Sequence, residues 1–149
     1  MSRRIVISTV AGAVVLAGAG AFALAYAGDQ PPALTQSTAR YAAPVADRSG
    51  SLSFTTEVTA SAGVKSVKVL AWPAASSLTK EEPTAEDMAQ VESARCTPAG
   101  GHTARCTYRV AVSRSDAETS PRGRWHVAVL ATDEDGRSTL DTKADDFSV

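Results

Sequence analysis

The sequence predicts a mainly β protein, an antiparallel β-sandwich with one short helix, preceded by an N-terminal signal segment. Three observations predict it. Apolar and polar residues alternate with a period of two in several stretches after residue 50. Gly, Pro and Asp-Gly turn signals separate those stretches. The first 27 residues have the composition of an export signal.

Composition excludes several classes of protein without selecting an activity. The chain has 149 residues and a net charge of −1, from 15 Lys and Arg against 16 Asp and Glu. A nearly neutral chain lacks the basic surface that nucleic-acid binding requires, so no nucleic-acid partner is expected. A hydrophobic content of 44% is too high for a disordered tail, and two cysteines are too few for a zinc-ribbon cluster.

Residues 1–27 are predicted to be a signal peptide. A short basic start precedes an uncharged apolar run that ends in Ala25-Tyr26-Ala27, the small-x-small pattern of a cleavage site. We expect cleavage between Ala27 and Gly28 and a secreted, extracellular product. Two alternatives stay open. The uncut run is long enough to hold the protein in a membrane, and the paired arginines also fit a loose twin-arginine export pattern.

Residues 28–48 are predicted to be a linker, and residues 49–149 a single folded domain. The linker contains Pro31, Pro32 and Pro44 among many Ala, Ser, Thr and Gln, with room for one edge strand at Thr38–Ala43. About a hundred residues remain, which suits one compact domain.

Two strands open this domain. Leu52–Ala60 alternates apolar and polar residues, Ser61–Gly63 supplies a turn, and Val64–Trp72 is the predicted partner strand. Pro73 ends that strand, because proline has no N–H to donate to a ladder. Its two faces carry Val67, Val69 and Ala71 on one side and Leu70 and Trp72 on the other.

A short helix over residues 85–93 is the predicted cover for the Leu70 and Trp72 face. Thr84 is a suitable N-cap, and Pro83 and Met88 have the spacing of a hydrophobic staple. A helix of this length is not stable alone in water, so we expect it to pack on the sheet. If it does not, Leu70, Trp72 and Leu130 form an exposed apolar patch that would be a partner site.

The rest of the chain is predicted to be strands joined by tight turns. The expected order begins with a Cys96…Cys106 hairpin with a Gly100-Gly101 turn, a strand to Val112 and a helical turn capped at Ser115. A strand over Trp125–Thr132, an Asp135-Gly136 turn and a last strand that ends the chain near Phe147–Val149 follow.

Two resemblances add to this prediction. The segment Pro121–Gly136 resembles the penultimate strand and hairpin of immunoglobulin-like and fibronectin-type modules in bacterial secreted proteins, with Trp125 where those modules often place a corner tyrosine. Together with Ser51–Thr56, Gly63–Pro73 and the cysteine hairpin, the chain resembles a small family of secreted actinobacterial proteins known only as a domain of unknown function. That likeness covers most of residues 35–149 and implies an exported immunoglobulin-like fold. It implies no reaction, ligand or catalytic residue.

Cys96 and Cys106 are expected to form a disulfide, because exported proteins oxidise such pairs. A loop this short stabilises the fold by about 2–3 kcal/mol in the chain-entropy model. A redox or metal pair is the alternative, but such a pair usually has closer spacing and further ligands.

No catalytic, cofactor or metal site is predicted. His102 and His126 are expected to be surface residues, because the sequence lacks a G-x-S-x-G elbow that would place a nucleophile beside a base. Asp133-x-Asp135-Gly136 is only a fragment of a calcium loop and suits a hairpin turn better. Trp72, Tyr108 and Trp125 could stack on sugar rings, but core packing explains them more simply.

The sequence therefore favours a secreted, non-enzymatic immunoglobulin-like domain with a binding or structural role. Its expected partner is an extracellular protein or a cell-wall component of unknown identity. One alternative is an inhibitor of extracellular hydrolases that presents the loop Thr97–Arg105. The other is a small enzyme that uses His102 or His126.

Overall fold

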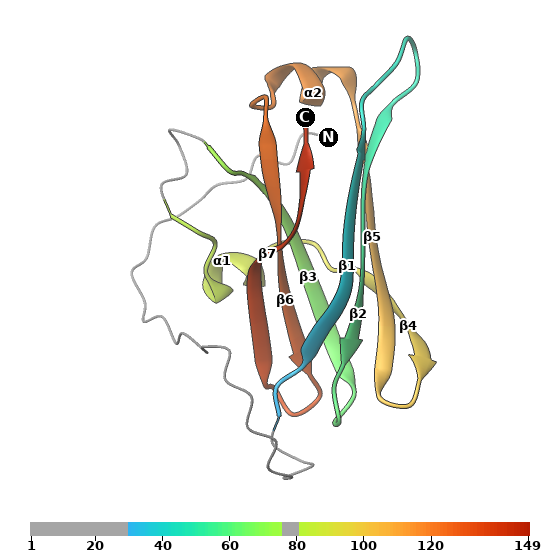
Figure 1. Cartoon of the computed structure of the whole chain (residues 1–149), viewed down its shortest axis with the longest axis vertical. Helices are drawn as coiled ribbons and strands as arrows, with labels where there is room; N and C mark the ends of the chain where they lie inside the picture. The colour runs from blue at the N-terminus through green and yellow to red at the C-terminus, as the bar shows by residue number, and fades with distance from the viewer. Residues whose placement is uncertain (1–29, 76–80) are drawn as a thin grey trace.

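The computed structural model describes residues 30–75 and 81–149 (Figure 1). The predicted signal peptide and its cleavage site at Ala27 and Gly28 lie outside the described residues. No helix in the described part of the chain is long and apolar enough to cross a membrane.

Seven strands form two antiparallel sheets in these two ranges. They are β1 (Ala33–Ala42), β2 (Gly50–Thr59), β3 (Val64–Pro73), β4 (Arg95–Gly100), β5 (Thr103–Val112), β6 (Arg124–Asp133) and β7 (Ser138–Ser148). One sheet has the order β1-β2-β5-β4 and the other the order β3-β6-β7. The sheets face each other, and β1 lies beside β7 along one side (Figure 1). The predicted β-sandwich is therefore confirmed.

Two short helices carry the chain from one sheet to the other. Helix α1 (Ala85–Ala89) joins β3 to β4, and α2 (Arg114–Thr119) joins β5 to β6 across one end of the sandwich (Figure 1). Thr84 caps α1 as predicted, in a capping box with Asp87. The helix is shorter than predicted, because the backbone at Glu92 and Ala94 pairs with β3 instead of continuing the helix.

The cap of α2 differs from the prediction. The N-cap is Ser113 in a capping box with Asp116, two residues before the predicted Ser115. Ser115 lies inside the helix. Both serines stand three residues before an acidic residue, so both fit the capping-box spelling.

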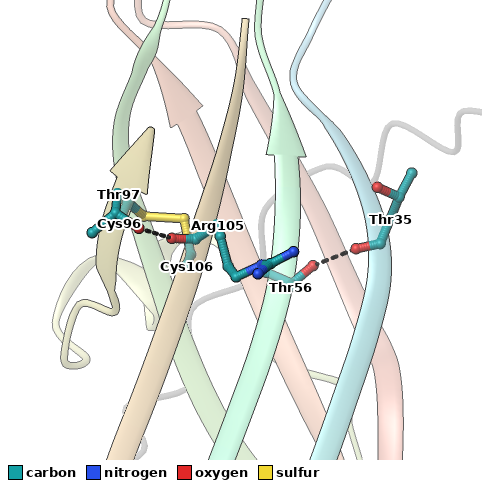
Figure 2. Close-up of a disulfide and its surroundings, with 6 residues drawn as sticks. All are labelled: Thr35, Thr56, Cys96, Thr97, Arg105 and Cys106. Atoms are coloured by element: carbon teal, nitrogen blue, oxygen red, sulfur yellow. Dashed lines mark hydrogen bonds between the residues drawn. A yellow bond between two sulfur atoms is a disulfide. The ribbon is translucent and has the colours of Figure 1, made fainter. Parts of the chain in front are cut away.

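Strand β1 is longer than the edge strand predicted at Thr38–Ala43. A bulge between Thr35 and Thr38 shifts the register and hides the alternation that would have predicted the first half of the strand. Gln36 has φ of +52°, in the left-handed region. The buried Thr56 hydroxyl donates to the Thr35 carbonyl oxygen at 3.1 Å, which satisfies a backbone group inside the bulge (Figure 2).

The core fills one half of the space between the sheets. Its buried members come from β2, β3, β5 and β6, at alternating positions: Phe54, Val58, Val67, Val69, Cys106, Val127, Val129 and Ala131. Neighbouring strands of a sheet place these residues side by side, as in the β3–β6 pair, where Val69 lies opposite Val129. The predicted alternation is confirmed on the core face of β2 and β3. In β6 the residues Val127–Ala131 are all buried, because Ala128 and Leu130 on its outer face lie in the cluster with Met88 of α1.

A second apolar cluster lies on the outer face of the three-stranded sheet, beneath α1 (Figure 1). Met88 of the helix is fully buried against Trp72 and Leu130, whose exposed fractions are 8% and 9%. Leu70 packs against this cluster and is half-buried. The helix therefore covers this face as predicted, and Leu70, Trp72 and Leu130 are not an open apolar patch.

Candidate functional site

The disulfide joins two neighbouring strands of one sheet (Figure 2). Cys96 of β4 and Cys106 of β5 are directly opposite in the register, with Cα atoms 4.0 Å apart. The Cys106 side of the bond is buried in the core, whereas Cys96 is exposed at the edge. The bond therefore fastens the edge strand β4 to the body of the sheet.

The hairpin Thr97–Arg105 is a paired structure over nearly its whole length. Only Gly101 and His102 lie outside β4 and β5, and Gly101 has φ of +56°, which glycine adopts freely. His102 is exposed at the tip, and its carbonyl oxygen accepts a hydrogen bond from the Ala60 N–H at 3.0 Å. The structure thus presents a tight turn at the position proposed for an inhibitory loop.

His126 is not the ordinary surface residue that the sequence suggests. Its side chain is 13% exposed, its Nδ1 lies 2.5 Å from Asp146 Oδ1, and its ring centroid lies 4.8 Å from that of Trp72. Asp146 is its cross-strand partner on β7. In the described ranges no serine, threonine or cysteine side chain forms a hydrogen bond with this ring. Within residues 30–75 and 81–149 this pair therefore has no nucleophile bonded to it of the kind that a catalytic triad uses.

The acidic hairpin between β6 and β7 is held by its own side chains. The fully buried Asp133 carboxylate accepts hydrogen bonds from the Asp135 N–H and from the N–H and Nε of Arg137, at 2.8–3.0 Å. Burial raises the pKa of Asp133, but these hydrogen bonds and the guanidinium charge outweigh it and lower the pKa below its ordinary value. No cluster of three potential metal ligands occurs within the described residues.

A cleft occupies the other half of the space between the sheets, beyond the buried core. It has a volume of about 1110 Å³ and is bounded by both sheets, by the segment after α1 and by α2. Its side-chain and backbone lining includes Tyr41, Leu52, Val69, Leu70, Ala71, Tyr108, Val110, Val112, Trp125, Phe147 and Val149. Pockets for drug-sized ligands measure roughly 300–1,000 Å³, so this cleft is large enough for a ligand of several residues or rings.

Aromatic rings line one wall of the cleft. Phe147 lies between Tyr41 and Trp125 in a stacked row, with centroid distances of 5.9 Å and 6.0 Å. The Trp125 indole N–H donates to the Pro121 carbonyl oxygen at 2.9 Å, which fixes the ring. This bond to the upstream backbone is of the kind that a corner tyrosine forms in immunoglobulin domains. All three rings are half-buried, so the row is in contact with solvent.

The lining of the cleft carries negative charge. The Tyr108 phenol donates to Glu92 Oε2 at 3.2 Å, and Asp87 and Asp116 also line the cleft. Burial, with smaller contributions from the charge and the hydrogen bond of Glu92, raises the pKa of Tyr108 to about 12. No lysine, arginine or histidine belongs to the described lining. The cleft therefore combines apolar walls with negative charge.

A family model described as a family of unknown function, DUF5707, matches residues 34–131. The chain belongs to this family. The match begins in β1 and ends in β6, so it covers most of the cleft but not Phe147 or Val149. No curated protein and no solved structure matches the chain.

Sequence reasoning identified only part of the cleft of this DUF5707 chain. The sequence predicts that Tyr108 and Trp125 pack in the core, whereas the structure places both in the cleft lining. Tyr41, Val110 and Phe147 carried no separate signal, because their spacing is the same as that of core residues. Of the residues predicted for a partner patch, Leu70 reaches the cleft lining, whereas Trp72 and Leu130 lie beneath α1.

Proposed function

We propose that this protein is an exported, non-enzymatic binding domain with an immunoglobulin-like fold, and that its ligand site is the cleft between the two sheets. The sheet orders β1-β2-β5-β4 and β3-β6-β7 support the fold, because they correspond to ABED and CFG in constant-type immunoglobulin domains. One departure is that the disulfide joins two strands of one sheet rather than the two sheets.

The exposure of inward-facing apolar side chains carries this proposal. Tyr108, Val110 and Val112 follow the fully buried Cys106 in the inward-facing row of β5, yet they are only half-buried. Across the cleft Trp125 and Phe147 are half-buried too. A concave apolar surface left in contact with water is typical of a site that a ligand covers.

The non-enzymatic part of the proposal rests on the chemistry of the cleft. Within the described residues the cleft is lined by no histidine, cysteine or lysine, and each of its carboxylates already accepts a hydrogen bond, from Thr84, Tyr108 or Ser113. His126 lies on the opposite face of β6 from Trp125, against Trp72. Conversion of a substrate that is lost in His126→Ala would contradict this part.

Export is supported by two features. The first 27 residues have the composition of a signal peptide. The cysteine pair forms a structural disulfide, and such bonds persist in oxidising compartments outside the cytoplasm. We infer a secreted protein that meets its ligand outside the cell.

The cleft can be tested with two fluorescent probes of similar ring size and different charge. We expect neutral N-phenylnaphthylamine to bind, and anionic anilinonaphthalene sulfonate to bind at least about tenfold more weakly, because the lining is acidic. Val110→Lys places a charge on the apolar wall and should abolish binding. Thr107→Lys places the same charge on the exposed outer face of β5 and should leave binding unchanged.

Two results would overturn the proposal. One is the absence of binding of either probe to the wild-type protein. The other is equal loss of binding in both lysine variants. Inhibition of a secreted hydrolase that disappears when Thr103–Arg105 are changed would assign the function to the disulfide hairpin instead.

A further inference from the structure

We infer that the cleft accepts an extended basic peptide, which adds as a strand to the free edge of β5. This inference rests on the proposed function, since it names the ligand of the same cleft. Three observations support it: an unpaired length of β5, a barrier to pairing on the facing edge of β3, and the negative charge of the lining.

The first observation is the unequal length of β4 and β5. On one side β5 pairs with β2 over all ten residues, from Thr103 to Val112. On the other side β4 pairs with it only as far as Thr107. Among the described residues no strand lies beside that edge over Tyr108–Val112. Such an edge offers N–H and C=O groups to an incoming peptide.

The chain itself explains why this edge is open. The segment between α1 and β4 pairs with the other sheet: the Val69 N–H donates to the Glu92 carbonyl at 3.1 Å, and the Ala94 N–H donates to the Val67 carbonyl at 2.8 Å. The segment then crosses to begin β4 at Arg95. This crossing segment therefore joins the two sheets, and the cleft lies beyond the crossing.

The facing edge of β3 is a poorer acceptor. Its groups at Val67 and Val69 are already paired with the segment after α1. The strand ends at Pro73, which has no N–H. Only a short length of β3 around Ala71 remains free between Val69 and Pro73. A peptide in the cleft would therefore form a longer ladder of hydrogen bonds with β5 than with β3.

The side chains of the cleft determine what the peptide must carry. Alternate residues of an added strand would point into the cleft, beside the inward row of Tyr108, Val110 and Val112 and opposite Trp125 and Phe147. Apolar side chains at those positions would cover surface that water now contacts. They would extend the core into the open half of the sandwich.

The charge of the lining favours a basic residue on the peptide. Glu92 accepts a hydrogen bond from the Tyr108 hydroxyl, and Asp87 and Asp116 are the acidic members of the two capping boxes. Hydrogen bonds from Ser113 lower the pKa of Asp116, so it stays ionised at neutral pH. A carboxylate can accept several hydrogen bonds at once, so one that already has a partner can also bind an ammonium or guanidinium group.

The test uses three capped peptides of about six residues, the usual length of a strand. The first has Val at every second inner position, so that Val enters the cleft, and a Lys at each end, where Glu92 and Asp116 lie beside the two ends of the free edge. The second has the same sequence with alternate backbone amides N-methylated, which removes donors for a ladder. The third replaces Lys by Glu. Affinity is measured by isothermal titration calorimetry, and backbone amide exchange of the labelled protein by NMR.

We expect the Val-Lys peptide to bind and to slow exchange of the amides in Tyr108–Val112 that face the free edge. The N-methylated and Glu peptides should bind about tenfold more weakly or not at all, because one loses the ladder and the other is repelled. Glu92→Gln should lower the affinity for the Val-Lys peptide about fivefold. Glu118→Gln removes an exposed charge outside the lining and should have no effect.

The outcomes separate this inference from the proposed function. Equal binding of the N-methylated peptide overturns strand addition, and equal binding of the Glu peptide overturns the preference for a base. Binding of the neutral naphthylamine probe without binding of the Val-Lys peptide overturns this inference and leaves the cleft as a binding site. Failure of both probe and peptide overturns both.

Discussion

The Tyr108 hydroxyl donates a 3.2 Å hydrogen bond to the Glu92 carboxylate within the lining of the cleft. Tyr108 belongs to β5 of one sheet, and the backbone of Glu92 pairs with β3 of the other. The bond therefore connects the two sheets at the level where the buried core ends. It also couples the chemistry of the cleft to the stability of the fold.

This bond predicts a loss of stability at high pH. An unfolded tyrosine ionises near pH 10, whereas the folded Tyr108 has a pKa of about 12. The folded state thus retains the proton longer, and the stabilisation from the neutral phenol is complete below about pH 10 and lost as the pH rises to about 12. Tyr108→Phe should remove this part of the pH dependence.

Ultraviolet absorbance of tyrosinate measures the same pKa directly. The difference in titration between the wild-type protein and Tyr108→Phe should have its midpoint near pH 12. A midpoint near 10, the ordinary tyrosine value, would show that Tyr108 is neither desolvated nor bonded to Glu92.

Loss of the disulfide is predicted to lower the free energy of unfolding by an amount that depends on which cysteine is replaced. Cys96→Ser should lower the free energy of unfolding by about 2–3 kcal/mol and leave the fold intact, because the core lies elsewhere and Cys96 is exposed. Cys106→Ser should be more destabilising, since it also buries a hydroxyl in the core. Urea denaturation gives both values, and free thiols in the unreduced wild-type protein would refute the bond.

Helix α1 covers the outer face of the three-stranded sheet with Met88, so we predict that removing this side chain destabilises the protein strongly. Met88→Ala should lower the free energy of unfolding by about 2–5 kcal/mol, because Met88 is fully buried against Trp72 and Leu130. In a Trp125→Phe background the fluorescence of Trp72 should shift to longer wavelength. Glu86→Ala, at an exposed position of the same helix, serves as control. An unchanged melting curve for Met88→Ala would mean that α1 does not cover the sheet.

The hairpin between β6 and β7 predicts an acid-dependent effect. Arg137→Met leaves the buried Asp133 carboxylate without its guanidinium and should lower the melting temperature at neutral pH. The pKa of Asp133 is lowered in the fold, so the contribution is present above about pH 4, the unfolded value, and lost as the pH falls further. The difference between the two proteins should therefore shrink in acid. A difference that is constant over this range would contradict the ion pair.

The sequence predicted the elements whose alternation is regular. Strands β3 and β6 present an unbroken apolar row to the core, and the row of β2 is interrupted only by Thr56, so a period of two is visible in all three. The first half of β1 was missed because the bulge at Gln36 breaks the period. The start of α2 was misplaced because Ser113 and Ser115 fit the same motif, and only the path of the chain selects between them.

The cleft could not be predicted from the sequence. Val110 and Val129 are both valines on inward faces of alternating strands, yet one is half-exposed in the cleft and the other fully buried. The difference depends on where the crossing segment at Glu92–Arg95 joins the sheets, which no local pattern records. The pairing of His126 with Asp146 is hidden for a similar reason, because it depends on the register of β6 and β7.

The most direct test of the binding cleft is an NMR measurement of contacts between bound N-phenylnaphthylamine and side-chain protons. We predict nuclear Overhauser effects from the probe to the Val110 methyl groups and to the Trp125 ring, and none to Thr107 on the outer face of β5. Contacts confined to the hairpin tip at His102, or to the α1 face of the sheet, would contradict a ligand site between the sheets.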